Sequence, residues 1–200
     1  MTSAQGLTHL AISLIEKRLK DRYKSRVKFD VIGTPGDLDA ARDLAQRSEH
    51  DGRYQFQYWA VSLVEANPAQ NKKKGADGGV DGIKFFRDLD QKDAHKVVVS
   101  VKSGKLKPDD IRALMAVRAK EQAEIALLVT LDEPSAKMIA DAASAGFYKS
   151  VAGKNYARLQ ILTIAGLLAG TQRAAHPDYE PDLNQKKAKA EAHGEQPELL

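Results

Sequence analysis

Apolar residues recur with helical and strand-like spacings that alternate along the chain as far as about residue 170. Residues 7–23 place leucines and isoleucines mostly on one side of a helix, with the charged run EKRLKDR on the other side. Residues 54–66, YQFQYWAVSLVEA, predict a second amphipathic helix, which an Asn-Pro pair ends. On this helix, Trp59 and Tyr58 are expected to be core residues rather than base-stacking groups.

The segment between these two helices predicts a short strand and a third helix. Residues 28–37, KFDVIGTPGD, have the pattern of a strand that ends in a Pro-Gly turn. Asp37 then has the position of an N-cap for a helix over DAARDLAQ, residues 39–46. The chain changes character after the second amphipathic helix, where the polar, glycine-rich run NKKKGADGG precedes two strand-like runs, VDGIKFF and HKVVVSVK.

The second half of the chain predicts helices and strands in alternation. The run IALLVTL, residues 125–131, is apolar throughout and bounded by polar residues, which indicates a central strand buried on both faces. Gly146 is expected at the C′ position of the helix that precedes it. The other predicted elements are a helix from residue 108 to about 122, a helix over 135–145, a strand over 159–164 and a short helix over 165–170.

This order of elements predicts a three-layer α/β core with a central mixed β-sheet. The two strands on either side of residue 90 should pair antiparallel, and the strands separated by crossover helices should run parallel. Residues 1–50 are expected to form an α/β extension packed on the core, because 50 residues bury little surface alone. Residues 51–173 would form the core domain. Residues 174–200 hold few large apolar groups, so a disordered polar tail is expected.

Composition and charge narrow the class of protein. The 200 residues are 42% hydrophobic and 29% charged, enough for a globular core, and cysteine is absent, which excludes thiolate zinc sites and disulfides. No run approaches a membrane span and no signal peptide is recognisable, so a cytoplasmic protein is expected, with no membrane partner. Residues 174–200 carry a net charge of −3 against +4 for the whole chain, which leaves +7 on residues 1–173. A basic core is compatible with a polyanionic partner.

Asp81 and Lys102 are the first candidates for chemistry. If the strands VDGIKFF and HKVVVSVK form a hairpin, Asp81 begins one strand and Lys102 ends the other, so both lie at one end of the sheet. A carboxylate there can hold a divalent cation, and a lysine can position a water molecule or steady charge on a phosphate. The alternative interpretation is that Asp77 and Asp81 are turn residues and Lys102 is a solvated strand end.

The pattern G-x-D-G-G-x-D-G, followed by an apolar strand that ends in x-V-K, resembles the catalytic signature of Mrr-type restriction endonucleases, a branch of the PD-(D/E)xK nuclease superfamily. A longer set of segments, covering roughly residues 8–170, resembles the C-terminal nuclease-like region of some bacterial DNA methyltransferases. This set is THLAISLI, VIGTPGDLDAARDLA, YQFQYWAVSLV, KKGADGGVDG, VVVSVKSG, ALLVTLDEPSAKM, AASAGFY and LQILTIAGLLAG. The resemblance implies a restriction-endonuclease-like fold and Mg²⁺-dependent hydrolysis of phosphodiester bonds in DNA, with Mn²⁺ as a substitute ion.

The resemblance also assigns roles to individual residues. Asp81 matches the metal-binding aspartate, Lys102 the signature lysine, and the backbone carbonyl of Val101 a further metal ligand. Ser100 stands where the superfamily most often has Glu and Mrr-type members often have Gln, which is a departure from the pattern. Gln57 stands where related nucleases frequently place a helical acid.

The low number of acids in this pattern leaves two functions open. Asp77 and Glu65 are candidates to compensate for Ser100 and Gln57 as ion ligands. The first function is a Mg²⁺-dependent endonuclease of the restriction or modification-dependent type, acting on double-stranded DNA. The second is a DNA-binding module with a degenerate nuclease site, associated with a DNA methyltransferase in cis or in trans.

Several lysines are candidates for contacts with DNA phosphates. Lys72, Lys73 and Lys74 precede the Asp81 turn, and Lys105 follows Lys102. The alternative for the lysine triplet is an ordinary solvated loop.

The pattern leaves the oligomeric state open, with a dimer among the options. The recognition sequence and any dependence on DNA methylation are also not specified by the sequence.

Overall fold

The computed structural model describes residues 9–23, 31, 33–47, 52–69, 79–90 and 93–177. Among them, a five-stranded sheet has the order β1-β2-β3-β4-β7, and a two-stranded sheet pairs β5 with β6. The strands of the large sheet are β1 (Asn67–Pro68), β2 (Gly82–Phe86), β3 (His95–Lys102), β4 (Ile125–Thr130) and β7 (Leu159–Thr163). The helices are α1 (His9–Tyr23), α2 (Leu38–Gln46), α3 (Gly52–Leu63), α4 (Pro108–Lys120), α5 (Ala136–Ala143) and α6 (Ile164–Leu168).

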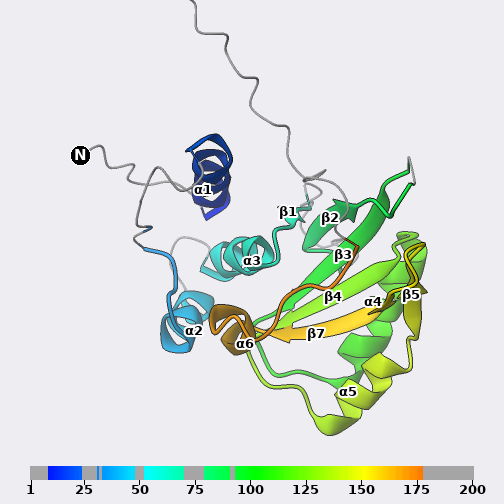
Figure 1. Ribbon diagram of the computed structural model, residues 1–200. Coiled ribbons are helices and arrows are strands. Elements are labelled where there is room, and N and C mark those ends of the chain that lie inside the picture. Colours follow the sequence, from blue (N-terminus) through cyan, green and yellow to red (C-terminus); the bar gives the residue numbers. More distant parts are fainter. Residues whose placement is uncertain are drawn as a thin grey trace, which may run out of the picture.

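The predicted mixed sheet is confirmed. β2 pairs antiparallel with β3, with Gly82 opposite Val99. β3, β4 and β7 run parallel to one another. All six residues of β4 are buried, as its uninterrupted apolar run predicts for a central strand. The carboxyl ends of β3, β4 and β7 therefore lie at the same edge as the start of β2 (Figure 1).

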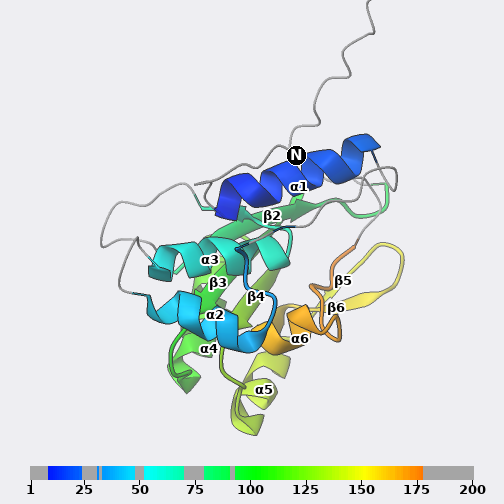
Figure 2. The same ribbon diagram turned by 90° about the vertical axis from the view of Figure 1, so that its left-hand side faces the viewer.

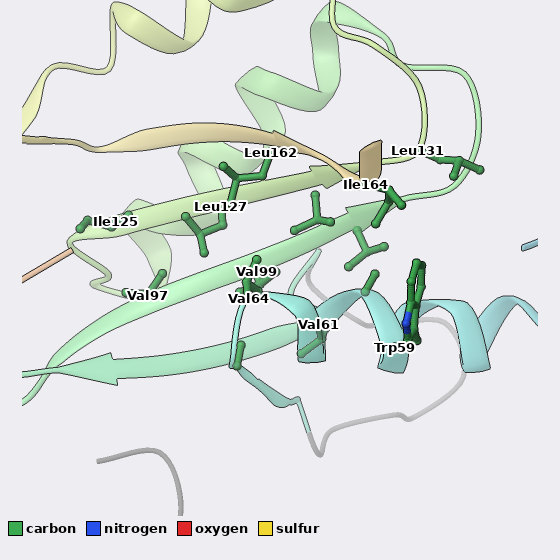
Figure 3. Close-up of a cluster of buried hydrophobic side chains, with 14 of the residues drawn as sticks. Trp59, Val61, Val64, Val97, Val99, Ile125, Leu127, Leu131, Leu162 and Ile164 are labelled. Carbon is green, nitrogen blue, oxygen red and sulfur yellow. The ribbon is translucent and has the colours of Figure 1, made fainter. Parts of the chain in front are cut away.

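Two hydrophobic clusters form the layers on either side of this sheet. Side chains of α3 pack against one face of β3 and β4, and Figure 3 shows Trp59, Val61 and Val64 directed at the strands. Buried side chains of α4 and α5 pack against the other face around Val98 and Leu128. The sheet is thus enclosed between helices on both faces, which confirms the predicted three-layer α/β core (Figure 1). Trp59 is a core residue, as expected, because only 3% of it is exposed.

The N-terminal elements lie on the α3 side of the molecule. α2 packs against α3, and the Asp37 side chain accepts a hydrogen bond from the N–H of Ala40 at 2.8 Å, which confirms the predicted N-cap. α1 lies beside α3 (Figure 2), although Ile15 remains 42% exposed. The strand predicted over residues 28–37 falls largely outside the described residues, and residues 33–36 contain no strand.

Helix ends differ in detail from the sequence expectations. α3 ends at Leu63, before the Asn-Pro pair that was expected to stop it, and Glu65 adopts a positive φ of 55°. The Asn-Pro pair instead forms β1 against the start of β2. Ser144 is the C-cap of α5, so Gly146, with φ of 73°, lies two residues beyond the cap rather than at C′.

The sequence did not predict the hairpin of β5 (Phe147–Lys149) and β6 (Asn155–Ala157). Buried Asp88, just past β2, fixes this hairpin to the sheet. It accepts hydrogen bonds from Tyr148 Oη at 2.8 Å, Ser150 Oγ at 2.7 Å and the N–H of Val151 at 2.9 Å. Burial alone raises the pKa of Asp88, but the hydrogen bonds outweigh it, and its pKa lies below the ordinary value of 3.8. Burial and the neighbouring Asp88 carboxylate raise the pKa of Tyr148.

The described C-terminal segment returns along the sheet. The Gln160 side chain bonds both the N–H and the carbonyl of Ala175, at 2.8 and 2.7 Å. The rings of His176 and Phe86 stack at a centroid distance of 5.7 Å. Residues 174–177 therefore pack on the core, and the rest of the predicted tail lies outside the described residues. No helix in the described part of the chain combines the length and apolar character needed to cross a membrane.

The Asp88 network makes a prediction about stability and pH. Asp88→Asn should lower the free energy of unfolding at pH 7 by about 2–3 kcal/mol, because an acceptor of hydroxyl and amide donors is lost inside the protein. Since the folded pKa is depressed, the contribution of Asp88 is fully present above pH 3.8 and is lost as pH falls through the folded pKa. Urea unfolding at pH 7 and at acid pH should show the deficit of the variant shrinking with acidification. Exposed Asp93→Asn is the control, and equal stabilities of the two variants at pH 7 would contradict the assignment.

The packing of α3 on β2 gives a second prediction. A Cβ atom on Gly82 would lie 2.7 Å from Cγ1 of Val61, whereas a Cβ atom on Gly104 would meet nothing within 4 Å. Gly82→Ala should therefore destabilise the protein by about 1–3 kcal/mol through overpacking. Gly104→Ala should change the free energy of unfolding by about 0.5 kcal/mol or less. Equal urea midpoints for the two variants would show that α3 does not pack this closely on β2.

Candidate active site

Asp81 lies immediately before β2 and is fixed to β3 by its backbone and its side chain. Its N–H donates to the carbonyl of Val99 at 2.8 Å, and its Oδ2 accepts from the N–H of Val101 at 2.7 Å. Its carbonyl also accepts from the N–H of Ala69 at 3.0 Å, next to β1. Because Val99 and Val101 flank Ser100 on β3, these hydrogen bonds hold Asp81 beside Ser100.

The alternation of β3 sends Ser100 and Lys102 to one face of the sheet. Val97, Val99 and Val101 belong to the cluster beneath α3, whereas Val98 belongs to the cluster beneath α4 and α5. Ser100 and Lys102 lie two and four residues after Val98, so they share the α4 side. Ser100 is 6% exposed, and the Lys102 side chain is 41% exposed at the edge. The structure thus brings Asp81 and Lys102 to the same end of the sheet, as the hairpin argument predicted, and Ser100 lies beside Asp81.

Two glycines allow the chain around Asp81 to lie close to the helices α4 and α3. Gly79 has φ of 78°, a conformation that side chains rarely adopt, and a Cβ atom there would lie 3.2 Å from Cγ2 of Val117 on α4. Gly82, directly after Asp81, has no room for a side chain against Val61. The chain on both sides of Asp81 is therefore held close to a helix, α4 on one side and α3 on the other.

Asp110 is a residue of the site that the sequence analysis missed. It lies in the first turn of α4, and its Oδ1 is 3.1 Å from Nζ of Lys102. The run Pro-Asp-Asp had been interpreted only as a helix start. The available signal was only an acid in the first turn of a helix, because the N-cap residue, Lys107, is not a typical capping residue. Its contact with Lys102 depends on how α4 packs against β3.

The remaining predicted residues divide into those placed near the site and those placed elsewhere. Gln57 is half-buried on α3, one helical turn before Val61, on the side of the helix that covers Gly82. Lys105 is exposed in the loop after Lys102. Glu65 forms an ion pair with the buried Lys84, with Nζ and Oε2 3.3 Å apart, on the α3 side of the sheet. Asp77, Lys72, Lys73 and Lys74 lie outside the described residues.

The oxygen donors at this edge fit a hard divalent cation. Mg²⁺ is commonly held by one or two carboxylates, with waters and phosphate oxygens completing the octahedron. Asp81 supplies a carboxylate, Ser100 a hydroxyl, and Val101 a backbone carbonyl on the adjoining strand. No three His, Cys, Asp or Glu side chains in the described residues cluster closely enough to hold an ion by themselves. Among the charged groups, an ion bound here would therefore depend chiefly on the Asp81 carboxylate and on oxygen atoms of a bound phosphate.

A solved structure described as MspJI restriction endonuclease in complex with a 27-mer oligonucleotide is similar to this chain, with a TM-score of 0.35 and 18% sequence identity. The similarity covers 85% of this chain and 32% of the other, so this chain spans about a third of that protein's length. No curated protein matches the chain.

A match to a family model shows the family of this chain. The model Mrr_cat, described as restriction endonuclease, matches residues 51–160, which is more than half of the 200 residues. The matched segment contains α3, the β2–β3 hairpin, α4, β4 and α5, and therefore every described residue of the site. This chain belongs to the Mrr_cat family of restriction endonuclease domains.

Proposed function

We propose that this protein is a Mg²⁺-dependent endonuclease of the restriction or modification-dependent type that hydrolyses phosphodiester bonds in double-stranded DNA. The observation that carries the proposal is the hydrogen bond from the N–H of Val101 to Asp81 Oδ2, at 2.7 Å. It places the carboxylate on the strand that also presents Lys102. The match of the restriction endonuclease family model to residues 51–160, which include both residues, supports the catalytic interpretation of this geometry over the alternative of a turn residue and a solvated strand end.

The roles of the side chains follow from their charges and exposure. Asp81, with Ser100 and the Val101 carbonyl, would hold Mg²⁺ or Mn²⁺. When bound, the ion supplies charge neutralisation at the attacked phosphate and a more acidic water. Lys102 is exposed enough to reach a DNA phosphate, and it would orient the attacking water and offset the charge that develops on the phosphate. Attack of water forms one P–O bond and breaks the P–O bond to the departing sugar oxygen. That oxygen takes up one proton of the water, and the second proton is released to solvent from the new phosphate monoester.

Contacts with DNA would come from the basic residues around this edge. Lys105 and Lys107 are both exposed in the loop between β3 and α4, directly after Lys102. Lysines in such positions bind phosphates without reading the base sequence. The lysine triplet at residues 72–74 would extend this basic surface. We also propose the cytoplasm as the location, residue 50 as the limit between the N-terminal extension and the core domain, and a core domain that includes residues 174–177.

Removing either charged residue should stop cleavage. Asp81→Asn and Lys102→Met should each reduce nicking of supercoiled plasmid in Mg²⁺ by at least about 100-fold, because each removes a charge that acts at the phosphate. Plasmids of several methylation states are the substrates, since methylation dependence is open. Lys120→Met, at the C-terminal end of α4, and Asp93→Asn, before the start of β3, are the matched controls, because both residues are exposed and lie toward the opposite end of the sheet. Wild-type protein that cuts none of these plasmids, in Mg²⁺ or Mn²⁺, would contradict the proposed activity.

A second candidate function is a DNA-binding module whose nuclease site is inactive, associated with a DNA methyltransferase. The observation in its favour is Ser100, a buried neutral residue where the family pattern has Glu or Gln. A hydroxyl adds no negative charge, so binding of an ion would be weaker than with a second carboxylate.

This second function predicts DNA binding without a need for metal. Fluorescence anisotropy should show affinity that falls steeply with salt, because bound lysines release counterions, and that is unchanged by EDTA. Calorimetric titration with Mn²⁺ should then show no binding to the wild type and measurable binding to Ser100→Glu. Binding of Mn²⁺ by the wild type, abolished in Asp81→Asn, would contradict the inactive-site function and support the endonuclease.

A further inference from the structure

The ion pair of Lys102 joins the site to α4. Lys102 Nζ lies 3.1 Å from Asp110 Oδ1, and the two side chains are 41% and 18% exposed. A lysine side chain has four rotatable methylene groups and a compact charge, so its ammonium group samples many positions when it has no partner. The partly buried carboxylate of Asp110 restricts the ammonium group of Lys102 to fewer of these positions.

Asp110 is itself fixed by the start of the helix. Its Oδ2 accepts a hydrogen bond from the N–H of Lys107 at 2.8 Å, and its own N–H donates to the Lys107 carbonyl at 2.9 Å. Ile111 and Leu114, on the same helix, are buried in the cluster beneath the sheet. The carboxylate is therefore attached to the core through its helix rather than placed on a loop.

Both oxygens of this carboxylate have partners. Oδ1 faces the ammonium group of Lys102, and Oδ2 faces the amide of Lys107. These contacts, with an ammonium group and an amide, directly support a role in holding Lys102. Each carboxylate oxygen keeps a second lone pair, so the Mn²⁺ titration below separates this role from metal binding.

We propose that Asp110 is a positioning residue that holds the Lys102 ammonium group at the edge where Asp81 lies. The proposal rests on the endonuclease function proposed above. Asp110 acts through Lys102: it keeps the ammonium group on the α4 side of the sheet, beside Ser100, and reduces the reorganisation needed when a phosphate arrives. Glu65, a candidate ion ligand from the sequence, pairs instead with Lys84.

The neighbouring residue provides a matched control. Asp109 lies one position earlier on α4, its side chain is 77% exposed, and it pairs with Arg112 on the same helix. Asp109→Asn removes the same charge from the same helical turn without touching the Lys102 contact. Any general effect of charge on DNA binding or on the helix dipole should appear in both variants.

The test measures single-turnover cleavage of plasmid in Mg²⁺ and Mn²⁺ affinity by calorimetry, with the full chain. Asp110→Asn should lower the cleavage rate at saturating DNA about 10- to 100-fold, since misplacement of a catalytic group by about 1 Å has effects of this size. The DNA concentration for half-maximal rate should change no more than in Asp109→Asn. Mn²⁺ affinity should equal that of the wild type. Asp110→Glu, which keeps the charge but adds a methylene group, should give an intermediate rate.

Other results would overturn the proposal. A cleavage rate for Asp110→Asn equal to that of Asp109→Asn would show that Lys102 needs no partner. Loss of Mn²⁺ affinity in Asp110→Asn would make Asp110 an ion ligand instead. If Asp110→Asn fails to fold, Asp110→Glu decides: a reduced rate with unchanged Mn²⁺ affinity supports positioning, and a wild-type rate refutes it. Wild-type protein that never cuts DNA would instead remove the proposed function, and this proposal with it.

Discussion

The hydrogen bond between the Val101 N–H and the Asp81 carboxylate links the two strands on which the site depends. A side chain here accepts from a backbone amide on β3, just beyond the last paired residues of β2 and β3. This hydrogen bond holds the carboxylate of Asp81 against β3. Because Lys102 is the next residue on that strand, the same bond sets the relation between the two charged groups. The rest of the fold can be understood as support for this arrangement.

That support comes from both layers. On one side, Val61 of α3 packs against Gly82, so the start of β2 cannot shift toward the helix. On the other side, α4 approaches Gly79 through Val117 and presents Asp110 to Lys102. The interior strand β4 is buried on both faces, and β3 pairs with it in parallel. A polar edge at the ends of strands, held by two packed layers, is the kind of position where an α/β fold places reactive groups.

The sequence predicted most of this core because its signals are local. The strand-like runs VDGIKFF and HKVVVSVK predicted the hairpin that brings Asp81 and Lys102 to one end of the sheet, and the apolar run IALLVTL identified the central strand. The β5–β6 hairpin was missed because its stability comes from Asp88, about 60 residues away in the chain, rather than from a turn motif. Asp110 was missed for a related reason. Its N-terminal helix position is visible in the sequence, but its contact with Lys102 arises from packing of α4 on the sheet.

The proposed endonuclease function depends on one divalent ion bound beside Asp81, Ser100 and the carbonyl of Val101. Paramagnetic broadening by substoichiometric Mn²⁺ in ¹H–¹⁵N spectra of the full chain tests this location directly, whether or not the protein cuts DNA. If the ion binds there, amide signals of residues 80–82 and 99–103 should broaden first, and Asp81→Asn should abolish this selective loss. Broadening that is uniform along the chain, or centred on residues far from this edge of the sheet, would contradict this location.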